Sequence, residues 1–293
     1  MILAAIDIGS NAARLLITEV INTSGNTVFN KLNLIRVPLR LGFDVFENKV
    51  ISEKKVQMML ETMKAFKFLM NAYSVDNMIA CATSAMRDAE NSPAIVEKVK
   101  IETGIQIKVI SGDMEANLVF ENHIAENMDK DHTYLYIDVG GGSTELSFYS
   151  NGNLSFKRSY NIGTIRLIKK QVEDNVWESM KTDLRNVTKG HKEVVAIGSG
   201  GNINKIFSLS KKKEGKPLPV ELLRDYYREL ESVSVDERII RYNLKADRAD
   251  VIVPALSIYI NVMRWANSSV IFVPKIGLAD GLIRHLWDEI NIK

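Results

Sequence analysis

The chain has 293 residues, which is enough for two domains of ordinary size, each with a core of its own. Its composition, with 46% apolar and 25% charged residues, is typical of a water-soluble globular protein. The net charge of +2 is too small to indicate nucleic acid binding, so any polyanion must be bound by a few locally placed arginines and lysines. The single cysteine, Cys81, excludes an intrachain disulfide and is expected to pack as a small buried residue.

The first ten residues lack the features of a secretory signal. They form an apolar stretch that Asp7 interrupts, without a basic segment or a cleavage site. The longest later apolar run, residues 251–263, is too short to span a bilayer. We therefore expect a cytoplasmic protein without a membrane partner.

Strands and helices alternate through the first half of the chain. A strand, a turn at Gly9-Ser10-Asn11 and a second strand are predicted over residues 4–20. Apolar residues at three- and four-residue intervals predict a helix that Ser52 caps. A strand at residues 77–82 is expected to lead into a loop, ATSAMRDA.

A helix that stops at Gly104 and a further strand follow in the first half. The next helix is expected to begin at Asp113, which is a suitable N-cap residue. Glu115 then lies in the first turn of that helix, directly after a strand. A carboxylate there can complement the helix dipole, and this role alone would explain its presence.

The second half opens on the most distinctive stretch, residues 134–149, which read YLYIDVGGGSTELSFY. Three consecutive glycines predict a tight turn between two strands. Glycines allow positive φ and let backbone N–H groups face inward together, and such a concave set of donors suits phosphate oxygens. Asp138 and Glu145 flank the turn with carboxylates that suit a divalent cation. The alternative is a tight hairpin between two core strands that binds nothing.

This pattern of an acid before a glycine turn occurs twice. IDIGSN near the N-terminus corresponds to IDVGGGS in the second half, and Asp138 follows Asp7 by about one domain length. We therefore expect two related halves. The polar segment 127–132 places the boundary, which gives domains 1–126 and 127–293, with a C-terminal helix at 278–293 that can pack back on the first domain.

A third glycine turn, residues 198–201, follows a predicted strand and precedes a predicted helix. A helix N-terminus carries unpaired donors and partial positive charge, so this order suits phosphate, although a close backbone contact explains it equally well. The remaining helices are expected at 176–188, 220–231, 235–242, 247–265 and 278–287. The alternation of strands and helices predicts an α/β fold with mixed sheets in two lobes.

An ordered set of motifs resembles one family over nearly the whole chain. The motifs are AIDIGSNAARLLI, ATSAMRDA, VISGDMEA, YIDVGGGSTEL, GTIRL, AIGSGG, RADVI and GLADGLI. In this order they resemble the Ppx/GppA family of exopolyphosphatases and guanosine pentaphosphate phosphohydrolases. The resemblance implies a duplicated, two-lobe actin-like, Hsp70-like and sugar-kinase-like fold, related to ribonuclease H, with the ligand in a cleft between the lobes.

The resemblance also implies roles for single residues. Glu115 would be the general base that activates a water for in-line attack on a terminal phosphorus. Magnesium, or manganese, would bind to Asp138 and Glu145, with Asp7 as a further ligand. The positions expected to bind phosphate are Ser10, Asn11, Arg14, Arg87, Gly140, Gly141, Gly142, Ser143, Thr144, Gly200 and Gly201. Arg166 and Lys205 are additional candidates in the second lobe.

We therefore expect a homodimeric phosphohydrolase that acts on inorganic polyphosphate or on guanosine pentaphosphate. Two departures from the family pattern matter: Met114 replaces the usual first acid beside Glu115, and Gly-Gly-Asn replaces the usual Gly-Thr pair of the third turn. Two alternatives stay open. One is a polyphosphate or nucleotide sensor without turnover, which Met114 favours, and the other is an ATP-dependent kinase of the same fold.

Overall fold

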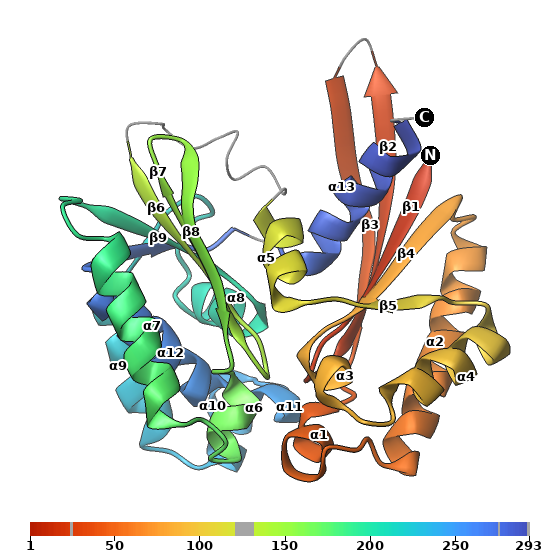
Figure 1. Cartoon of the computed structure of the whole chain (residues 1–293), viewed down its shortest axis with the longest axis horizontal. Coiled ribbons are helices and arrows are strands. Elements are labelled where there is room, and N and C mark those ends of the chain that lie inside the picture. The colour runs from red at the N-terminus through yellow and green to blue at the C-terminus, as the bar shows by residue number, and fades with distance from the viewer. Residues whose placement is uncertain (24–25, 121–131, 275, 292–293) are drawn as a thin grey trace. The chain divides into compact units, whose positions relative to one another are not determined.

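The computed structural model describes residues 1–23, 26–120, 132–274 and 276–291. The chain divides into two compact units, one of Met1–Asn122 with Gly277–Lys293 and one of His123–Ile276 (Figure 1). The C-terminal helix therefore belongs to the first unit. The predicted boundary between residues 126 and 127 lies outside the described residues.

The first unit contains a five-stranded mixed sheet in the order β3-β2-β1-β4-β5. Its elements are β1 (Ile2–Ile8), β2 (Ala13–Thr23), β3 (Asn26–Val37), α1 (Gly42–Asn48), α2 (Glu53–Ala72), β4 (Asn77–Ala82), α3 (Ser84–Asp88), α4 (Ser92–Thr103), β5 (Ile107–Val109), α5 (Gly112–Phe120) and α13 (Leu278–Asn291).

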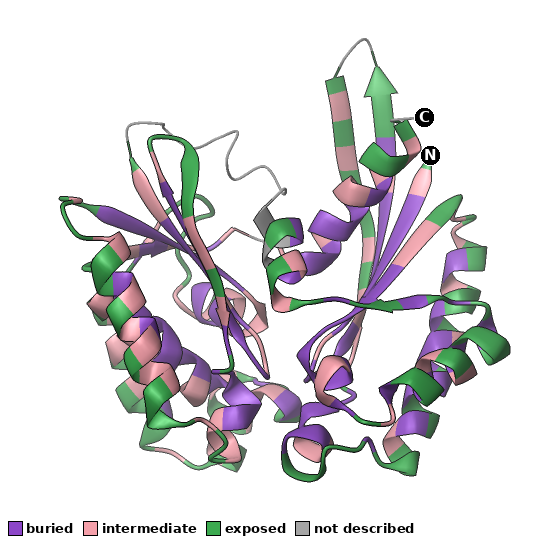
Figure 2. Ribbon diagram, in the orientation of Figure 1, coloured by how far each residue is buried: buried purple, intermediate pink, exposed green. Residues whose placement is uncertain are grey.

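The central strand β1 is buried over nearly its whole length, as Figure 2 shows. It pairs antiparallel with β2 and parallel with β4, while α13 packs against all three strands. Helix α13 also reaches β3, where the rings of Phe29 and Trp287 meet edge to face at 6.3 Å and Lys31 forms an ion pair with Asp280 at 2.5 Å. Helix α13 therefore provides a layer against which the apolar residues on one face of β1 pack.

The second unit contains a six-stranded sheet in the order β10-β11-β9-β6-β7-β8. Its elements are β6 (Thr133–Val139), β7 (Thr144–Ser150), β8 (Asn153–Tyr160), α6 (Thr164–Ile168), α7 (Asp174–Val187), β9 (Val194–Ser199), α8 (Gly201–Leu209), β10 (Leu218–Pro219), α9 (Val220–Glu231), α10 (Val235–Tyr242), α11 (Ala246–Ala249), α12 (Ile252–Trp265) and β11 (Val270–Phe272).

The two sheets share one topology, which confirms the predicted duplication. Read from the other edge, the second sheet runs β8-β7-β6-β9-β11, which matches β3-β2-β1-β4-β5 strand for strand, and β10 is an addition. In each unit the first strand pairs antiparallel with the second and parallel with the fourth. The α/β class with two mixed sheets is thus confirmed, whereas the predicted cleft between the lobes stays a prediction.

Local predictions failed at two helix starts. Helix α5 begins one residue before Asp113, and the Ser111 hydroxyl accepts the Met114 amide at 3.2 Å, so Ser111 takes the capping role. The predicted loop ATSAMRDA contains the short helix α3.

The predicted helix 247–265 is divided into α11 and α12. Pro254 lies in the first turn of α12. Proline has no backbone N–H, but the N–H groups of a first turn make no intrahelical hydrogen bond, so proline is tolerated there. A new helix therefore starts at this point, and α11 does not continue through it. Helix α12 carries the long apolar run of the sequence. Within the described residues, no helix combines the length and the apolar character that a membrane span requires.

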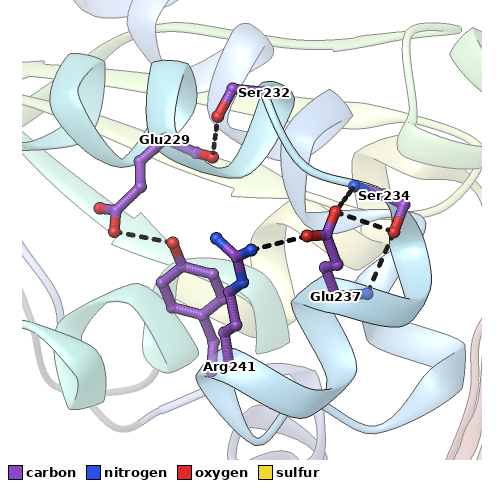
Figure 3. A network of polar contacts seen from close by, with 6 residues as sticks. Glu229, Ser232, Ser234, Glu237 and Arg241 are labelled. Atoms are coloured by element: carbon purple, nitrogen blue, oxygen red, sulfur yellow. Dashed lines mark hydrogen bonds and ion pairs between the residues drawn. The ribbon is translucent and has the colours of Figure 1, made fainter.

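Polar contacts hold α10 in place, although none of its residues is fully buried (Figure 3). The Ser234 hydroxyl accepts the Glu237 amide at 3.2 Å, and the Glu237 carboxylate accepts the Ser234 amide at 3.0 Å, which is a capping box. The Tyr242 hydroxyl donates to Glu229 on α9 at 2.7 Å. Helix α10 is therefore capped at its own N-terminus and is joined by hydrogen bonds to α9 and, through donation from Arg238 to the Ala249 carbonyl at 3.0 Å, to α11.

Asp44 on α1 connects this helix to the start of α2. Its carboxylate accepts hydrogen bonds from the Ser52 amide (3.0 Å), the Ser52 hydroxyl (2.6 Å) and the Lys55 ammonium (2.5 Å). Ser52 lies at the N-cap position of α2, as predicted. Its hydroxyl donates to Asp44, however, and accepts no hydrogen bond from an α2 amide. Burial acts to raise the pKa of Asp44, yet the hydrogen bonds from Lys55 and Ser52 outweigh it and lower that pKa.

Replacing Asp44 should destabilise the first unit in a pH-dependent way. Asp44→Ala is expected to lower the free energy of unfolding by about 1–3 kcal/mol at neutral pH, because it leaves three donors without their charged acceptor. The lowered pKa makes this contribution full above the unfolded value of about 3.9, and it is lost as the pH falls through the folded pKa. Urea unfolding over a pH series measures both effects.

The exposed α2 residue Glu61 provides a matched control. Glu61→Ala removes an exposed carboxylate that accepts a hydrogen bond from the Gln57 side chain at 3.1 Å, and it should change the free energy of unfolding by no more than about 0.5 kcal/mol. A difference between Asp44→Ala and wild type that stays constant into the acid range would contradict the assignment.

Candidate functional site

The glycine turn of the second unit joins β6 to β7. Asp138 pairs with Glu145 and Val139 pairs with Thr144 across the two strands, so the four residues 140–143 form the turn. Within the turn the Gly140 amide donates to the Ser143 carbonyl at 2.9 Å. The predicted hairpin is therefore present at the predicted residues.

The carbonyl groups of all three glycines accept hydrogen bonds from the beginning of α6. The contacts are Thr164 N to Gly140 O at 3.1 Å, Ile165 N to Gly141 O at 2.8 Å and Arg166 Nε to Gly142 O at 2.6 Å. In a trans peptide the C=O and the following N–H point in opposite directions, and no cis peptide is present among the described residues. The amides of Gly141, Gly142 and Ser143 therefore point away from α6, and consecutive amides on one side of the backbone form an anion-binding nest.

Gly163 makes this arrangement possible, and the sequence analysis did not single it out. A Cβ atom added at Gly163 would lie 2.5 Å from the Gly141 carbonyl carbon and 2.5 Å from that of Gly142, which is closer than real Cβ contacts allow. Only glycine lets the start of α6 come so near. Arg166, whose side chain donates to the turn, is itself only 7% exposed.

Thr144 and Ser143, two of the positions expected to bind phosphate, are both buried beside the turn. The Thr144 hydroxyl donates to the Ile162 carbonyl at 2.6 Å, and the residue is fully buried. Ser143 is also buried, at 2% exposure. The Thr144 hydroxyl therefore holds the turn to the segment before α6, and the phosphate contacts predicted for these two residues stay predictions.

Asp138 and Glu145 face each other across β6 and β7. Residues paired in antiparallel strands share a face of the sheet, and two like charges there repel each other. Glu145 is only 4% exposed and accepts the Ser159 hydroxyl at 2.7 Å. Among the described side chains, no group of three or more His, Cys, Asp or Glu gathers closely enough to bind a metal. Two carboxylates nevertheless fit magnesium, which commonly binds through one or two carboxylates together with substrate phosphates and water.

The third glycine turn lies beside Asp138 in the same unit. Strand β9 pairs Ser199 with Asp138, and Gly200 follows with φ +113°, in the left-handed region that favours glycine. A Cβ atom at Gly200 would lie 3.3 Å from Asp138 Oδ1 and 3.2 Å from the Val139 carbonyl oxygen. The structure thus brings together Gly200, the N-terminus of α8 at Gly201 and the end of β6.

The first unit repeats the turn geometry between β1 and β2. The Gly9 amide donates to the Ala12 carbonyl at 3.0 Å, as Gly140 donates to Ser143 in the second unit. The Ser10 carbonyl accepts the Gly42 amide (2.8 Å), and the Asn11 carbonyl accepts the Arg40 amide (2.9 Å). By the same peptide geometry, the amides of Asn11 and Ala12 point away from the start of α1.

The two hairpins differ in charge at one paired position. Asp7 pairs with Arg14 across β1 and β2, and their side chains form an ion pair at 2.7 Å with Asp7 almost fully buried. The corresponding pair in the second unit is Asp138 with Glu145. Arg14 therefore neutralises the first hairpin, and the Asp7 carboxylate, predicted as a metal ligand, is bound to a guanidinium.

Glu115 lies in the same region of the first unit as Asp7. It is 9% exposed in the first turn of α5. Burial raises the pKa of the Cys81 thiol to about 11; Lys108 opposes this shift, while the nearby Asp7 and Glu115 carboxylates add to it. A raised pKa keeps the Cys81 thiol on β4 protonated at neutral pH, which makes it a poor nucleophile.

Two further contacts fix the surroundings of Glu115 and Ser10. Arg87 donates to the Ile110 carbonyl at 3.0 Å, just before α5 begins, so this arginine ties α3 to the segment that carries Glu115. The buried Ser10 hydroxyl lies 2.7 Å from the Ser84 hydroxyl. Ser84 lies in the predicted loop ATSAMRDA and was not among the predicted site residues.

The fold and its two glycine turns define a duplicated α/β protein of actin-like architecture. The family described as the Ppx/GppA phosphatase family matches residues 20–289. The chain therefore belongs to the Ppx/GppA phosphatase family.

Three curated relatives carry three different names. A guanosine-5'-triphosphate,3'-diphosphate pyrophosphatase of Aliivibrio fischeri is 24% identical and covers 98% of this chain and 60% of its own length. An exopolyphosphatase 1 of Mycobacterium bovis is 27% identical over 60% of this chain and 50% of its own length. A bifunctional 3-dehydroquinate synthase/phosphatase of Fusobacterium nucleatum is 38% identical over 57% of this chain and 26% of its own length. The chain thus spans between about a quarter and three-fifths of these relatives.

Solved structures support the fold. An exopolyphosphatase from Cytophaga hutchinsonii has a TM-score of 0.84 at 23% identity, covering 99% of this chain and 98% of that one. The Aquifex aeolicus Ppx/GppA family member has a TM-score of 0.77 at 24% identity with the same coverage. At these identities the likeness establishes the architecture alone.

Gly163→Ala tests the close approach of α6 to the glycine turn. The added methyl group should force α6 away and lower the free energy of unfolding by about 1–3 kcal/mol, as overpacking does in tight contacts. Gly277→Ala is the control, because a Cβ atom there meets nothing within 4 Å. Urea unfolding of the two variants checks the prediction, and equal stabilities would show that α6 does not press on the turn.

Proposed function

We propose that this chain is a phosphohydrolase that releases the terminal phosphate of inorganic polyphosphate or of guanosine pentaphosphate. The observation that carries the proposal is the fixed direction of the Gly141, Gly142 and Ser143 amides beside the carboxylates of Asp138 and Glu145. Such a nest binds phosphate oxygens without reorganisation, and the adjacent carboxylates suit the cation that accompanies a polyphosphate. The names of the relatives, exopolyphosphatase and guanosine-5'-triphosphate,3'-diphosphate pyrophosphatase, support both substrates.

Glu115 is the proposed general base. It accepts a proton from a water whose oxygen forms a bond to the terminal phosphorus, while the bridging P–O bond breaks and its electrons stay with the shortened phosphate chain. The low exposure of Glu115 supports this role, because a carboxylate shielded from bulk water holds a single water in a fixed direction. Asp113, two residues earlier and exposed, has no such shielding.

Arg14 is the proposed phosphate clamp of the first unit. One nitrogen donates to Asp7, which fixes the guanidinium, and a guanidinium has five N–H donors in all. The remaining donors suit a planar, two-point contact with phosphate oxygens. Asp7 then acts through Arg14.

Magnesium, or manganese, is the proposed cofactor, held by Asp138 and Glu145. When bound, the cation draws negative charge from the phosphate oxygens. It would also relieve the repulsion between the two paired carboxylates.

Glu115→Gln tests the general base. The variant keeps the size of the side chain and removes its basicity, so kcat for phosphate release should fall by about 10²–10⁴-fold, while KM changes little. Phosphate release from polyphosphate and from guanosine pentaphosphate, measured side by side, also ranks the two substrates.

Asp113→Asn is the matched control, because it removes a neighbouring carboxylate of the same helix turn and should keep kcat within about threefold. Turnover by Glu115→Gln at the wild-type rate would refute the role of Glu115. Tight substrate binding by wild type without any phosphate release would instead support the sensor.

Removal of divalent cations should abolish phosphate release, and Glu145→Gln should weaken cation binding. We expect the dissociation constant for Mn²⁺, read directly by calorimetry, to rise at least about tenfold. Glu193→Gln makes the same change at an exposed glutamate of the same unit, and it should leave the dissociation constant unchanged. Equal Mn²⁺ affinities in the three proteins would exclude Glu145 as a ligand.

A further inference from the structure

The side chain of Tyr259 extends from α12 to the third glycine turn. In the sequence, Tyr259 lies within the apolar run 251–263, which is typical of a core residue. The side chain is 1% exposed and belongs to the apolar core of the second unit. Its hydroxyl donates a hydrogen bond to the Ser199 carbonyl. A Cβ atom at Gly200 would lie 3.6 Å from the same hydroxyl.

This hydrogen bond sets the direction of one amide. The Ser199 carbonyl belongs to the peptide plane that precedes Gly200, and the C=O and N–H of a trans peptide point in opposite directions. Because the carbonyl is held toward Tyr259, the Gly200 amide points away from it. Tyr259 thus does for the third turn what α6 does for the glycine turn between β6 and β7.

The same hydroxyl is close to a proposed cation ligand. The Tyr259 hydroxyl lies close enough to Asp138 to interact with its carboxylate electrostatically. A tyrosine hydroxyl is protonated at neutral pH and can donate to the Ser199 carbonyl. A Cβ atom at Gly200 would be 3.3 Å from Asp138 Oδ1, so a shift of this turn would also disturb Asp138.

We propose that Tyr259 is a positioning residue, whose hydroxyl fixes the Ser199–Gly200 peptide and thereby the Gly200 amide and the Asp138 carboxylate. Its effect on the turn is independent of the reaction, whereas its effect on phosphate and cation binding rests on the proposed function. Two separate measurements distinguish these effects.

The first measurement is amide hydrogen exchange in Tyr259→Phe, which keeps the ring and removes the hydroxyl. Exchange in the segment 197–204 should become at least about tenfold faster, because the Ser199 carbonyl loses its partner. Tyr160→Phe is the control: Tyr160 is 3% exposed, and its hydroxyl donates to Asp183 at 2.6 Å, so the variant also loses one hydrogen bond of a buried phenol. Unchanged exchange at 197–204 in Tyr259→Phe, or equal acceleration in Tyr160→Phe, would overturn the proposal.

The second measurement is made on the same variants with Mn²⁺ and with polyphosphate. Tyr259→Phe should raise the Mn²⁺ dissociation constant and the KM for polyphosphate by about tenfold, with kcat changed less, while Tyr160→Phe keeps wild-type values. A loss of kcat alone would contradict a positioning role. If the wild-type chain releases no phosphate, the proposed function fails, and the exchange measurement still decides the role of Tyr259.

Discussion

The hydrogen bonds between the glycine turn and the start of α6 are the constraint on which the rest of the site depends. A glycine turn by itself allows many backbone directions, and its amides would be as free as those of any loop. The carbonyls of Gly140, Gly141 and Gly142 are all tied to one short helix, so the amides on the other side of the backbone share one direction. Gly163 permits this because a side chain there would collide with the turn. A flexible sequence thus becomes a preorganised set of donors.

The duplication repeats this device and changes the charge at one paired position between the two units. Both hairpins place an aspartate at the end of the first strand, and both turn their amides away from the helix that follows the third strand. The facing position is Arg14 in one unit and Glu145 in the other. The first hairpin therefore pairs its aspartate with a guanidinium, while the second pairs two carboxyl side chains. The proposed phosphate clamp and the proposed cation site rest on this difference.

Positioning residues at the site come from elements far away in the sequence. The hydroxyl of Tyr259 on α12 donates to the Ser199 carbonyl before Gly200, and Arg87 on α3 donates to the Ile110 carbonyl before Glu115. The family match over residues 20–289 includes both of these elements. In the proposed site, the residues that bind the ligand and the residues that position them are separate sets, so a substitution in the second set is expected to alter binding indirectly.

The sequence by itself determined the class of fold, the duplication and the places of the three glycine turns, because these follow from local periodicity and from short motifs that repeat. It also placed Glu115 in a first helical turn after a strand, although it chose Asp113 as the cap where Ser111 caps. Only the tertiary structure decided the direction of the turn amides, the pairing of Asp7 with Arg14 and the contacts of Gly163 and Tyr259. Each of these depends on a contact between distant segments, and neither a propensity nor a motif encodes such a contact.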